Sequence, residues 1–260
     1  MTAAERPTRP VVSIVTPMFN AARVIDETMD SVAAQTFQDW EHLLIDDGSS
    51  DTTLAIARRR SEADARFVVL RTAGRAGALE ARNIGLDAAR GRYVAFLDAD
   101  DLWLTAKLER QVTFMRRTGA AISHTAYRRF DDAAGSPGRI IQPPARIGYR
   151  DLLGNTAIVM SAGIVDARQF GDLRVPAGGH PSLRSDLRFW LRCLRSGAEA
   201  HGLREDLVRY RVVTASLSSN PFRSAYWVWR TYRDYERLGL WTAGRGFVAY
   251  AFRAAKKRLG

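Results

Sequence analysis

The sequence predicts an α/β protein, built on a mostly parallel sheet between helices and followed by a helical extension at its C-terminal end. Short apolar runs alternate with segments of helical spacing, and acidic residues follow several of those runs. Of the 260 residues, 46% are hydrophobic and 26% are charged. These proportions are typical of a globular chain and exclude the disordered, collagen-like and coiled-coil classes.

The first hundred residues contain four runs of strand length. Residues 11–15 are largely β-branched and end at Thr16-Pro17, and the continuity of the run indicates a strand buried on both faces. Residues 22–34 follow with a helical spacing of apolar side chains, and the next run stops at Asp46-Asp47-Gly48. The predicted strands are 11–15, 42–45, 67–70 and 93–97, and the predicted helices are 22–34, 52–60 and 76–89.

The alternation becomes irregular in the second half. We expect a helix over 104–117, a strand over 121–130 and a loop rich in Gly, Pro and Asp over 131–146. Residues 185–196 have the pattern of an amphipathic helix, and a Gly/Pro-rich loop at 176–182 precedes it.

The last forty residues carry most of the excess positive charge. The chain has 39 basic and 28 acidic residues, a net charge of +11, and residues 221–260 contribute nine basic and two acidic residues, or +7. Ten aromatic residues are interleaved with these charges, which predicts two basic, aromatic helices broken near residues 239–246. Such a surface attracts an anionic partner, and nucleic acid, anionic lipid and nucleotide phosphates all qualify.

The expected organisation is a flexible N-terminus at 1–10, a sheet domain at 11–220 with halves at 11–104 and 105–220, and the extension at 221–260. The single cysteine, Cys193, excludes an intramolecular disulfide, and a reducing compartment fits. No apolar stretch reaches the roughly 18 residues that a membrane span requires. The four histidines are dispersed, so a histidine metal site is not expected.

Three carboxylates follow the run at 93–97, in the segment Asp98-Ala99-Asp100-Asp101. Like charges this close repel one another unless a cation is present, which points to a divalent metal. The alternative is that Asp100 or Asp101 caps the helix that follows.

Two further segments follow predicted strands and are expected near the same edge of the sheet. In open parallel sheets, ligands sit outside the carboxyl ends of the strands. Asp46 and Asp47 suit the NH and hydroxyl groups of a nucleoside, although an ordinary turn before a helix also explains the segment. Residues 74–85 offer glycines for close backbone approach, with Arg75 and Arg82 as partners of a diphosphate. This segment matches neither the P-loop nor the dinucleotide-binding fingerprint.

Together these segments resemble the family 2 glycosyltransferases, nucleotide-sugar-dependent enzymes of the GT-A fold, which is Rossmann-like. The resemblance rests on four motifs in order: residues 12–20, 46–51 (Asp-Asp-Gly-Ser-Ser-Asp), 81–85 (Ala-Arg-Asn-Ile-Gly) and 96–101 (Phe-Leu-Asp-Ala-Asp-Asp). Residues 209–211 and 216–218 are similar to the closing segments of bacterial polysaccharide-assembly members, including teichuronic-acid-type transferases. The resemblance implies that 11–104 is the nucleotide-binding half and 105–220 the acceptor half.

The resemblance also implies the roles of single residues. Asp186 stands where the family places its general base, with Ser185 in place of the common acidic partner, although an Asp favoured by the helix dipole is the alternative. By the resemblance, Asp100 binds the metal, Mg²⁺ or Mn²⁺, together with Asp98. The residues expected to bind the nucleotide or donor are Thr16, Pro17, Asn20, Asp46, Asp47, Arg82, Asn83, Asp98, Ala99 and Arg211.

Three of these expectations carry alternatives or rest on position alone. Arg211 is either a contact of the diphosphate or a strand-end arginine paired with Glu205 or Asp206. His180 lies in a loop just before Asp186 and is either an acceptor contact or a plain turn residue. Trp190, on the helix of Asp186, is a further candidate contact of the acceptor.

The function implied is inverting transfer of a sugar, with UDP as the expected carrier, to a glycan or a polyprenyl-linked acceptor in cell-surface polysaccharide assembly. The expected place is the cytoplasm, on the inner face of the membrane. Residues 221–260 either dock on anionic lipid or pack their aromatic side chains on the sheet domain with solvated arginines. Nucleic acid is not an expected partner. The alternative is a non-catalytic protein that binds nucleic acid or anionic membrane through its basic aromatic C-terminus, and it leaves the carboxylates unexplained.

Overall fold

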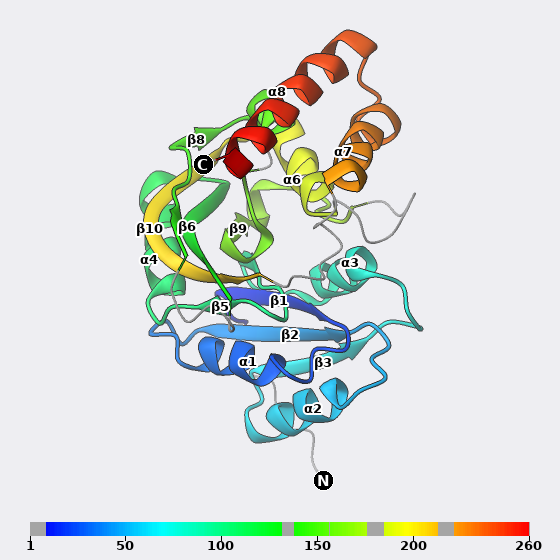
Figure 1. Cartoon of the computed structure of the whole chain (residues 1–260). Helices are drawn as coiled ribbons and strands as arrows, with labels where there is room; N and C mark the ends of the chain where they lie inside the picture. The colour runs from blue at the N-terminus through cyan, green and yellow to red at the C-terminus, as the bar shows by residue number, and fades with distance from the viewer. Residues whose placement is uncertain (1–8, 132–137, 156, 176–184, 213–220, 260) are drawn as a thin grey trace.

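The ten strands of the described residues form one sheet that helices cover on both faces (Figure 1). The structure is a computed structural model, which describes residues 9–131, 138–155, 157–175, 185–212 and 221–259. The strands are β1 (Val12–Met18), β2 (Trp40–Asp46), β3 (Phe67–Arg71), β4 (Tyr93–Phe96), β5 (Leu102–Trp103), β6 (Ile122–Phe130), β7 (Ile140–Ile141), β8 (Arg146–Ile147), β9 (Gly163–Asp166) and β10 (Ala200–Arg211).

The strand order along the main path is β3-β2-β1-β4-β9-β6-β10-β5. The first four strands are parallel to one another, β9 runs antiparallel between β4 and β6, and β10 is parallel to β6. The short strands β7 and β8 add to β6 and β10. The predicted α/β fold with a mostly parallel sheet is confirmed.

Two hydrophobic cores lie on the two faces of this sheet. Alternate residues of β1 face opposite ways: Val15 joins one core and Ile14 the other, and both are fully buried. One core receives α1, α2 and α4, and the other receives α3, α5, α6 and the C-terminal helices. The helices are α1 (Ile25–Ala33), α2 (Thr53–Ala63), α3 (Ala78–Ala88), α4 (Lys107–Thr118), α5 (Tyr149–Gly154), α6 (Ser185–Arg195), α7 (Pro221–Arg230) and α8 (Leu240–Leu259), with short turns η1 (Met160–Ala162), η2 (Ala167–Gln169) and η3 (Thr231–Tyr235).

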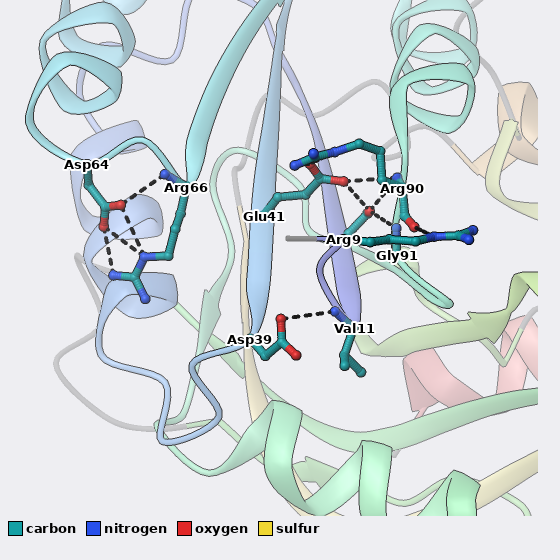
Figure 2. A network of polar contacts seen from close by, with 9 residues as sticks. Arg9, Val11, Asp39, Glu41, Asp64, Arg66, Arg90 and Gly91 are labelled. Carbon is teal, nitrogen blue, oxygen red and sulfur yellow. Dashed lines mark hydrogen bonds and ion pairs between the residues drawn. The ribbon is translucent and has the colours of Figure 1, made fainter. Parts of the chain in front are cut away.

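A buried carboxylate ties the first strands together at their amino ends (Figure 2). Glu41 on β2 accepts a hydrogen bond of 2.6 Å from the Ser13 hydroxyl of β1 and a bidentate pair from the Arg90 guanidinium. The Gly91 N–H donates to Ser13 Oγ at 2.8 Å, so the turn before β4 joins the same network. A charge buried to 2% exposure is tolerated here because several charge-assisted hydrogen bonds satisfy it.

The core also contains an unusual lysine at the start of α4. Lys107 is fully buried, and its Nζ lies 3.6 Å from the centre of the Trp103 ring. Within the described part of the chain Nζ has no hydrogen-bond partner, and burial lowers the pKa of Lys107 well below its usual value.

The structure corrects three of the predicted elements. The loop expected over 131–146 contains β7 and β8, because residues far away in sequence pair with them. The helix expected from 104 begins at Lys107, since Leu102 and Trp103 form β5 against β10. The break in the C-terminal segment lies before residue 240, at the π-helical turn η3 and the residues after it, rather than at 239–246.

The C-terminal helices lie at the end of the molecule opposite to α1 and α2, where α8 packs on α5 and α7 packs on α8 (Figure 1). The absence of a side chain at Gly246 lets α8 approach closely, because a Cβ there would lie 3.3 Å from Leu153 Cβ. Val228 of α7, Tyr232 of η3 and Ala243 of α8 are fully buried. The inner faces of these helices therefore belong to the core.

Candidate active site

The carboxyl ends of β1, β2 and β4 meet at one edge of the sheet, as their parallel pairing requires. The three predicted motifs end there, and the Asp98–Asp101 segment leads from β4 to β5. The side chain of Thr28 on α1 donates to the carbonyl oxygens of Ala99 at 2.8 Å and of Asp101 at 3.1 Å. The backbone of the acidic segment is thus clamped from outside the sheet.

Arg82 connects this segment to the helix of the expected base. Its Nη2 donates to Asp98 Oδ1 at 2.7 Å, and its Nη1 donates to the Ser185 hydroxyl at 2.8 Å. The arginine is 9% exposed, whereas the Asp98 side chain is 33% exposed and faces the open edge. The structure therefore brings together three residues that lie far apart in sequence.

Asp100 and Asp101 differ in their surroundings. Burial, and then the charge of Asp98, raise the pKa of Asp100 to about 6. Asp101 is 1% exposed and accepts hydrogen bonds from the Ser161 hydroxyl at 2.5 Å and from the Arg211 N–H at 2.9 Å. Burial also raises the pKa of Asp101 well above its usual value. Asp101 therefore holds the segment in place, while Asp98 and Asp100 remain for a ligand.

The capping alternative for this segment is wrong. The N-cap of α4 is Ala106, so neither Asp100 nor Asp101 caps that helix. The acidic segment is held by Ser161, whose hydroxyl donates to Asp101 and whose oxygen accepts from the Asp98 N–H at 3.1 Å.

Arg211 lies under the acidic segment with its guanidinium 4.6 Å from the Phe130 ring centre. It donates from Nε to the Asp100 carbonyl at 2.8 Å and from Nη2 to Glu27 at 2.7 Å. Arg211 thus forms an ion pair with Glu27 of α1.

The acids considered as alternative partners of Arg211 have arginine partners of their own. Glu205 pairs with Arg110, and Asp206 pairs with Arg128 and Arg209.

Asp186 is the second residue of α6 and is half-buried. Burial, and then the charges of Asp101, Asp98, Asp100 and Asp186, raise the pKa of the Tyr210 hydroxyl of β10. The neighbour of Asp186 in sequence, Ser185, is joined to Asp98 through Arg82, which connects the start of α6 to the acidic segment.

The expected nucleoside-binding carboxylates are deeply buried. Asp47 accepts hydrogen bonds from the N–H groups of Ala76 and Gly77, each at 2.8 Å, and from the Thr72 hydroxyl at 3.1 Å. Asp46 is fully buried and accepts from the Ser49 N–H at 3.2 Å. Both residues therefore shape the loops around the site.

Thr16, Pro17 and Asn20 lie where β1 ends. The Thr16 hydroxyl is 2.8 Å from Nε2 of His42 in β2, Pro17 is half-buried, and Asn20 Oδ1 accepts from the Ser50 N–H at 2.9 Å. Asn20 also has a left-handed backbone, with φ of 48°. Its side chain thus joins the loop after β1 to the loop after β2.

Two further expected contacts have structural partners. Asn83 exchanges a pair of hydrogen bonds with the backbone of Val175, at 2.9 and 3.0 Å, and is 2% exposed. Trp190 is 1% exposed and packs edge-on against Phe96 and Phe189 in the core, so its ring is not available to an acceptor. His180 lies outside the described residues.

The side chains around the acidic segment can be compared with the ligands that a divalent ion prefers. Within the described ranges no group of three or more His, Cys, Asp or Glu side chains forms a metal cluster. Asp98 and Asp100 nevertheless supply oxygen ligands of the kind that Mg²⁺ and Mn²⁺ prefer. Burial, and then the charge of Asp98, raise the pKa of Asp100, and a bound cation would oppose both effects. The two carboxylates fit an ion whose remaining ligands come from elsewhere.

Several residues of this site had no signature in the sequence. Ser161 and Thr28 reach the acidic segment, and Glu27 reaches Arg211, only through the fold, from η1 and α1. Their residue types are common and their spacing to Asp98 is irregular, so no local pattern identifies them.

Comparison with known proteins agrees with this arrangement. The pattern of "Glycosyl transferase family 2" matches residues 13–165, and the chain belongs to this family. A Bacillus subtilis protein named TuaG, assigned as a glycosyltransferase of teichuronic acid biosynthesis, is 39% identical over 251 residues, covering 96% of this chain and 98% of the relative. The Escherichia coli protein WfgD, named as a UDP-Glc:α-D-GlcNAc-diphosphoundecaprenol β-1,3-glucosyltransferase, is 31% identical and covers 86% of each chain.

Solved structures share the fold at low sequence identity. TarS of Staphylococcus aureus in complex with UDP superposes with a TM-score of 0.64 at 16% identity, covering 92% of this chain and 70% of TarS. The mannosyltransferase PcManGT of Pyrobaculum calidifontis, in complex with GDP-Man and Mn²⁺, also gives 0.64, at 17% identity, covering 97% of this chain and 77% of the other. The GT-A fold expected from the sequence is confirmed.

Proposed function

We propose that this chain is an inverting glycosyltransferase of cell-surface polysaccharide assembly, which moves a sugar from a UDP-sugar to a hydroxyl of a glycan or polyprenyl-linked acceptor. The observation that carries the proposal is the connection Asp98–Arg82–Ser185, which ties the acidic segment to the helix of Asp186. The names of TuaG and WfgD support the pathway and the lipid-linked acceptor, and the UDP complex of TarS supports the donor.

Asp186 is the proposed general base. The acceptor hydroxyl attacks the anomeric carbon, Asp186 takes the hydroxyl proton, and the bond from that carbon to the nucleoside diphosphate breaks on the opposite face. The half-buried position of Asp186 leaves its carboxylate accessible to an acceptor hydroxyl. One displacement of this kind inverts the configuration of the sugar.

Asp100 and Asp98 are the proposed holders of Mg²⁺ or Mn²⁺. Such an ion stabilises the charge that grows on the departing diphosphate. Arg82 adds a fixed positive charge beside Asp98, with little reorganisation because the structure already holds its guanidinium. Arg211 supports the backbone of the segment through its hydrogen bond to the Asp100 carbonyl, and it is the second arginine proposed to approach the diphosphate.

The remaining donor residues are proposed to form the nucleoside pocket largely through their loops. Asp46, Asp47, Asn20 and Asn83 fix loop backbones, and Ala99 presents its own backbone at the edge. Thr16 and Pro17 form the floor at the end of β1.

The proposed place of the reaction is the inner face of the cell membrane, where a cytoplasmic nucleotide sugar meets a lipid-linked acceptor. Among the described residues no helix is both long enough and apolar enough to cross a bilayer.

The first experiment is a calorimetric titration with UDP, GDP and dTDP, each in the presence of Mn²⁺ or of EDTA. We expect metal-dependent binding of UDP. Asp100→Asn should weaken that binding and reduce transfer by about a hundredfold or more, as loss of one electrostatic contact to the leaving group does. Asp186→Asn should leave UDP binding unchanged and reduce transfer by about 10²–10⁴-fold, the usual contribution of a general base.

The matched control is Asp26→Asn, which removes an exposed carboxylate that pairs with Arg60 on the surface. This variant should bind UDP and transfer sugar as the wild type does. Failure of the wild type to bind any of the three nucleotides, together with tight and salt-sensitive binding of nucleic acid, would overturn the proposal in favour of the binding-protein alternative.

A further inference from the structure

The two C-terminal helices expose nearly all of the large hydrophobic side chains that face solvent in the described part of the chain. Two other exposed residues of this type, Phe19 and Val212, lie elsewhere and are only 36% and 39% exposed. The six on the C-terminal helices are Phe222 (84%), Tyr226 (51%), Leu240 (66%), Trp241 (90%), Val248 (68%) and Phe252 (72%). A concentration of this kind marks an interaction surface.

The packing of α8 fixes which of its residues point outward. Its inner side rests on α5 through Gly246, Tyr250 and the hydrogen bond from Arg253 Nη1 to the Gly154 carbonyl at 2.6 Å. Trp229 of α7 stacks edge-on against Phe247 at 5.6 Å, which joins the two helices. These contacts therefore fix the orientation of α8 about its own axis.

In that orientation an apolar stripe runs along the outer side of α8. Trp241, Arg245, Val248 and Phe252 recur at intervals of four, three and four residues, the spacing of one helix face, and all four are exposed. The helix has 20 residues and is about 30 Å long at the usual rise. We call this stripe, with Leu240 at its start and the exposed Phe222 and Tyr226 of α7, the outer apolar face.

Two basic residues of this part of the chain are exposed, Arg223 on α7 and Arg245 on α8. In the sequence, Lys256, Lys257 and Arg258 follow Phe252. The segment 221–260 has a net charge of +7. Apolar side chains rimmed by cationic groups are the pattern of a helix that lies in the headgroup region of an anionic membrane.

We propose that α7 and α8 dock the protein on an anionic lipid bilayer, with Trp241, Val248 and Phe252 entering the interfacial region and the basic residues contacting lipid headgroups. A second copy of the chain fits the face poorly, because two surfaces of the same positive charge would meet. A nucleic acid fits its charge but not its aliphatic members, Leu240 and Val248, which offer no ring for base stacking.

The inference deepens the proposed function, on which it rests for the identity of the acceptor as a membrane lipid. Docking would place the enzyme where a lipid-linked acceptor resides and would raise the acceptor concentration that the site meets. Donor binding does not depend on it, so the two proposals fail separately.

The test is co-sedimentation of the full chain with vesicles of phosphatidylcholine alone or with about 30% phosphatidylglycerol, each at about 50 and 300 mM salt. We expect binding to the anionic vesicles only, weaker at high salt. Two variants separate the contributions: W241Q/F252Q removes apolar contacts, and R223A/R245A removes charge. Each variant should weaken binding tenfold or more. For R223A/R245A this follows because one basic residue near the surface contributes about fivefold.

The matched control is R116A/R117A, which removes two exposed arginines from the last turn of α4. It should bind vesicles as the wild type does. All variants should unfold in urea at the same denaturant concentration as the wild type, which confirms that they fold whether or not the chain binds UDP. In addition, lipids brominated near the headgroup should quench the wild type more than Trp241→Phe, because Trp241 is 90% exposed in the free protein.

Four results would overturn the inference. They are equal binding to neutral and anionic vesicles, loss of binding in R116A/R117A as large as in R223A/R245A, no change in W241Q/F252Q, and stronger binding to single-stranded RNA than to vesicles. Self-association of the wild type that W241Q/F252Q abolishes, without any vesicle binding, would assign the face to a second copy of the chain.

Discussion

Two buried histidines should make the free energy of unfolding fall in mild acid. His42 in β2 is fully buried and His124 in β6 is 1% exposed. Burial lowers the pKa of His42 to about 3 and that of His124 to about 4. Both are therefore neutral in the folded protein throughout the neutral and mildly acidic range.

The sign and size follow from proton linkage. On unfolding each histidine regains a pKa of about 6.5, so below that pH the unfolded chain binds protons that the folded chain does not. Stability is unaffected above about pH 7 and falls as the pH decreases from about 6.5 toward the folded values, by about 1.4 kcal/mol per pH unit and histidine. At about pH 5 each residue should therefore cost about 2 kcal/mol relative to pH 7.5.

The assay is urea unfolding, followed by tryptophan fluorescence at about pH 5 and pH 7.5 and at constant ionic strength. The raised pKa of Asp100 acts in the opposite direction, because the folded protein then binds the extra proton, so the total change mixes both effects. The informative quantity is the difference between variants. His42→Gln should reduce the acid-induced loss by about 2 kcal/mol, whatever its stability at pH 7.5.

The control is His201→Gln at the half-exposed start of β10, which should leave the acid-induced loss as in the wild type. An equal loss in His42→Gln and wild type would refute the reasoning, since it would mean that His42 accepts a proton in the folded state.

Three further predictions concern single contacts. Ser185→Ala removes a hydrogen bond to the Arg82 guanidinium, a contact worth about 1.5–3 kcal/mol, and should lower kcat/KM about tenfold or more. Ser185→Thr keeps the hydroxyl and should retain activity. Equal rates in all three forms would contradict a coupling between Ser185 and Arg82. Glu41→Gln should lower the free energy of unfolding in urea by about 2 kcal/mol, less than for a fully buried ion pair because its arginine partner keeps contact with water. Gly163→Ala would place a Cβ 2.3 Å from the Trp190 ring and should cost about 2 kcal/mol, which Trp190→Phe should partly restore if that clash is the cause.

The first half of the fold could be predicted closely because its elements obey simple periodicities. The strands expected at 42–45, 67–70 and 93–97 lie within β2, β3 and β4 or extend one residue past them. Each is short, apolar and flanked by a helix that covers it, so local sequence and burial agree.

The bounds of β10 could not be predicted in the same way. This strand is 12 residues long, carries several charged side chains and has register shifts between Leu203 and Asp206 and between Asp206 and Val208. Each shift changes which residues face the core, so the alternation of apolar and polar positions is lost. The pairing with β6 decides its structure, and that pairing links distant parts of the sequence.

In the candidate site, too, some residues could be predicted from local sequence and others depend on contacts between distant parts of the chain. The carboxylates of the acidic segment and Arg82 stand in recognisable motifs at strand ends. The supports from α1 and η1 do not, since a hydrogen bond between Ser161 and Asp101 depends on the packing of residues 60 positions apart. Trp190 shows the opposite error, because an aromatic residue beside the expected base is used by the core.

The burial of Lys107 has a practical consequence for chemical labelling. The chain has only three lysines, and the other two, Lys256 and Lys257, stand in the last turn of α8. An amine-acylating reagent needs a neutral, accessible amine, and the fully buried Lys107 is not accessible in the folded protein. Acylation of Lys107, followed by mass spectrometry, would therefore report the opening of the core around α4, independently of any substrate.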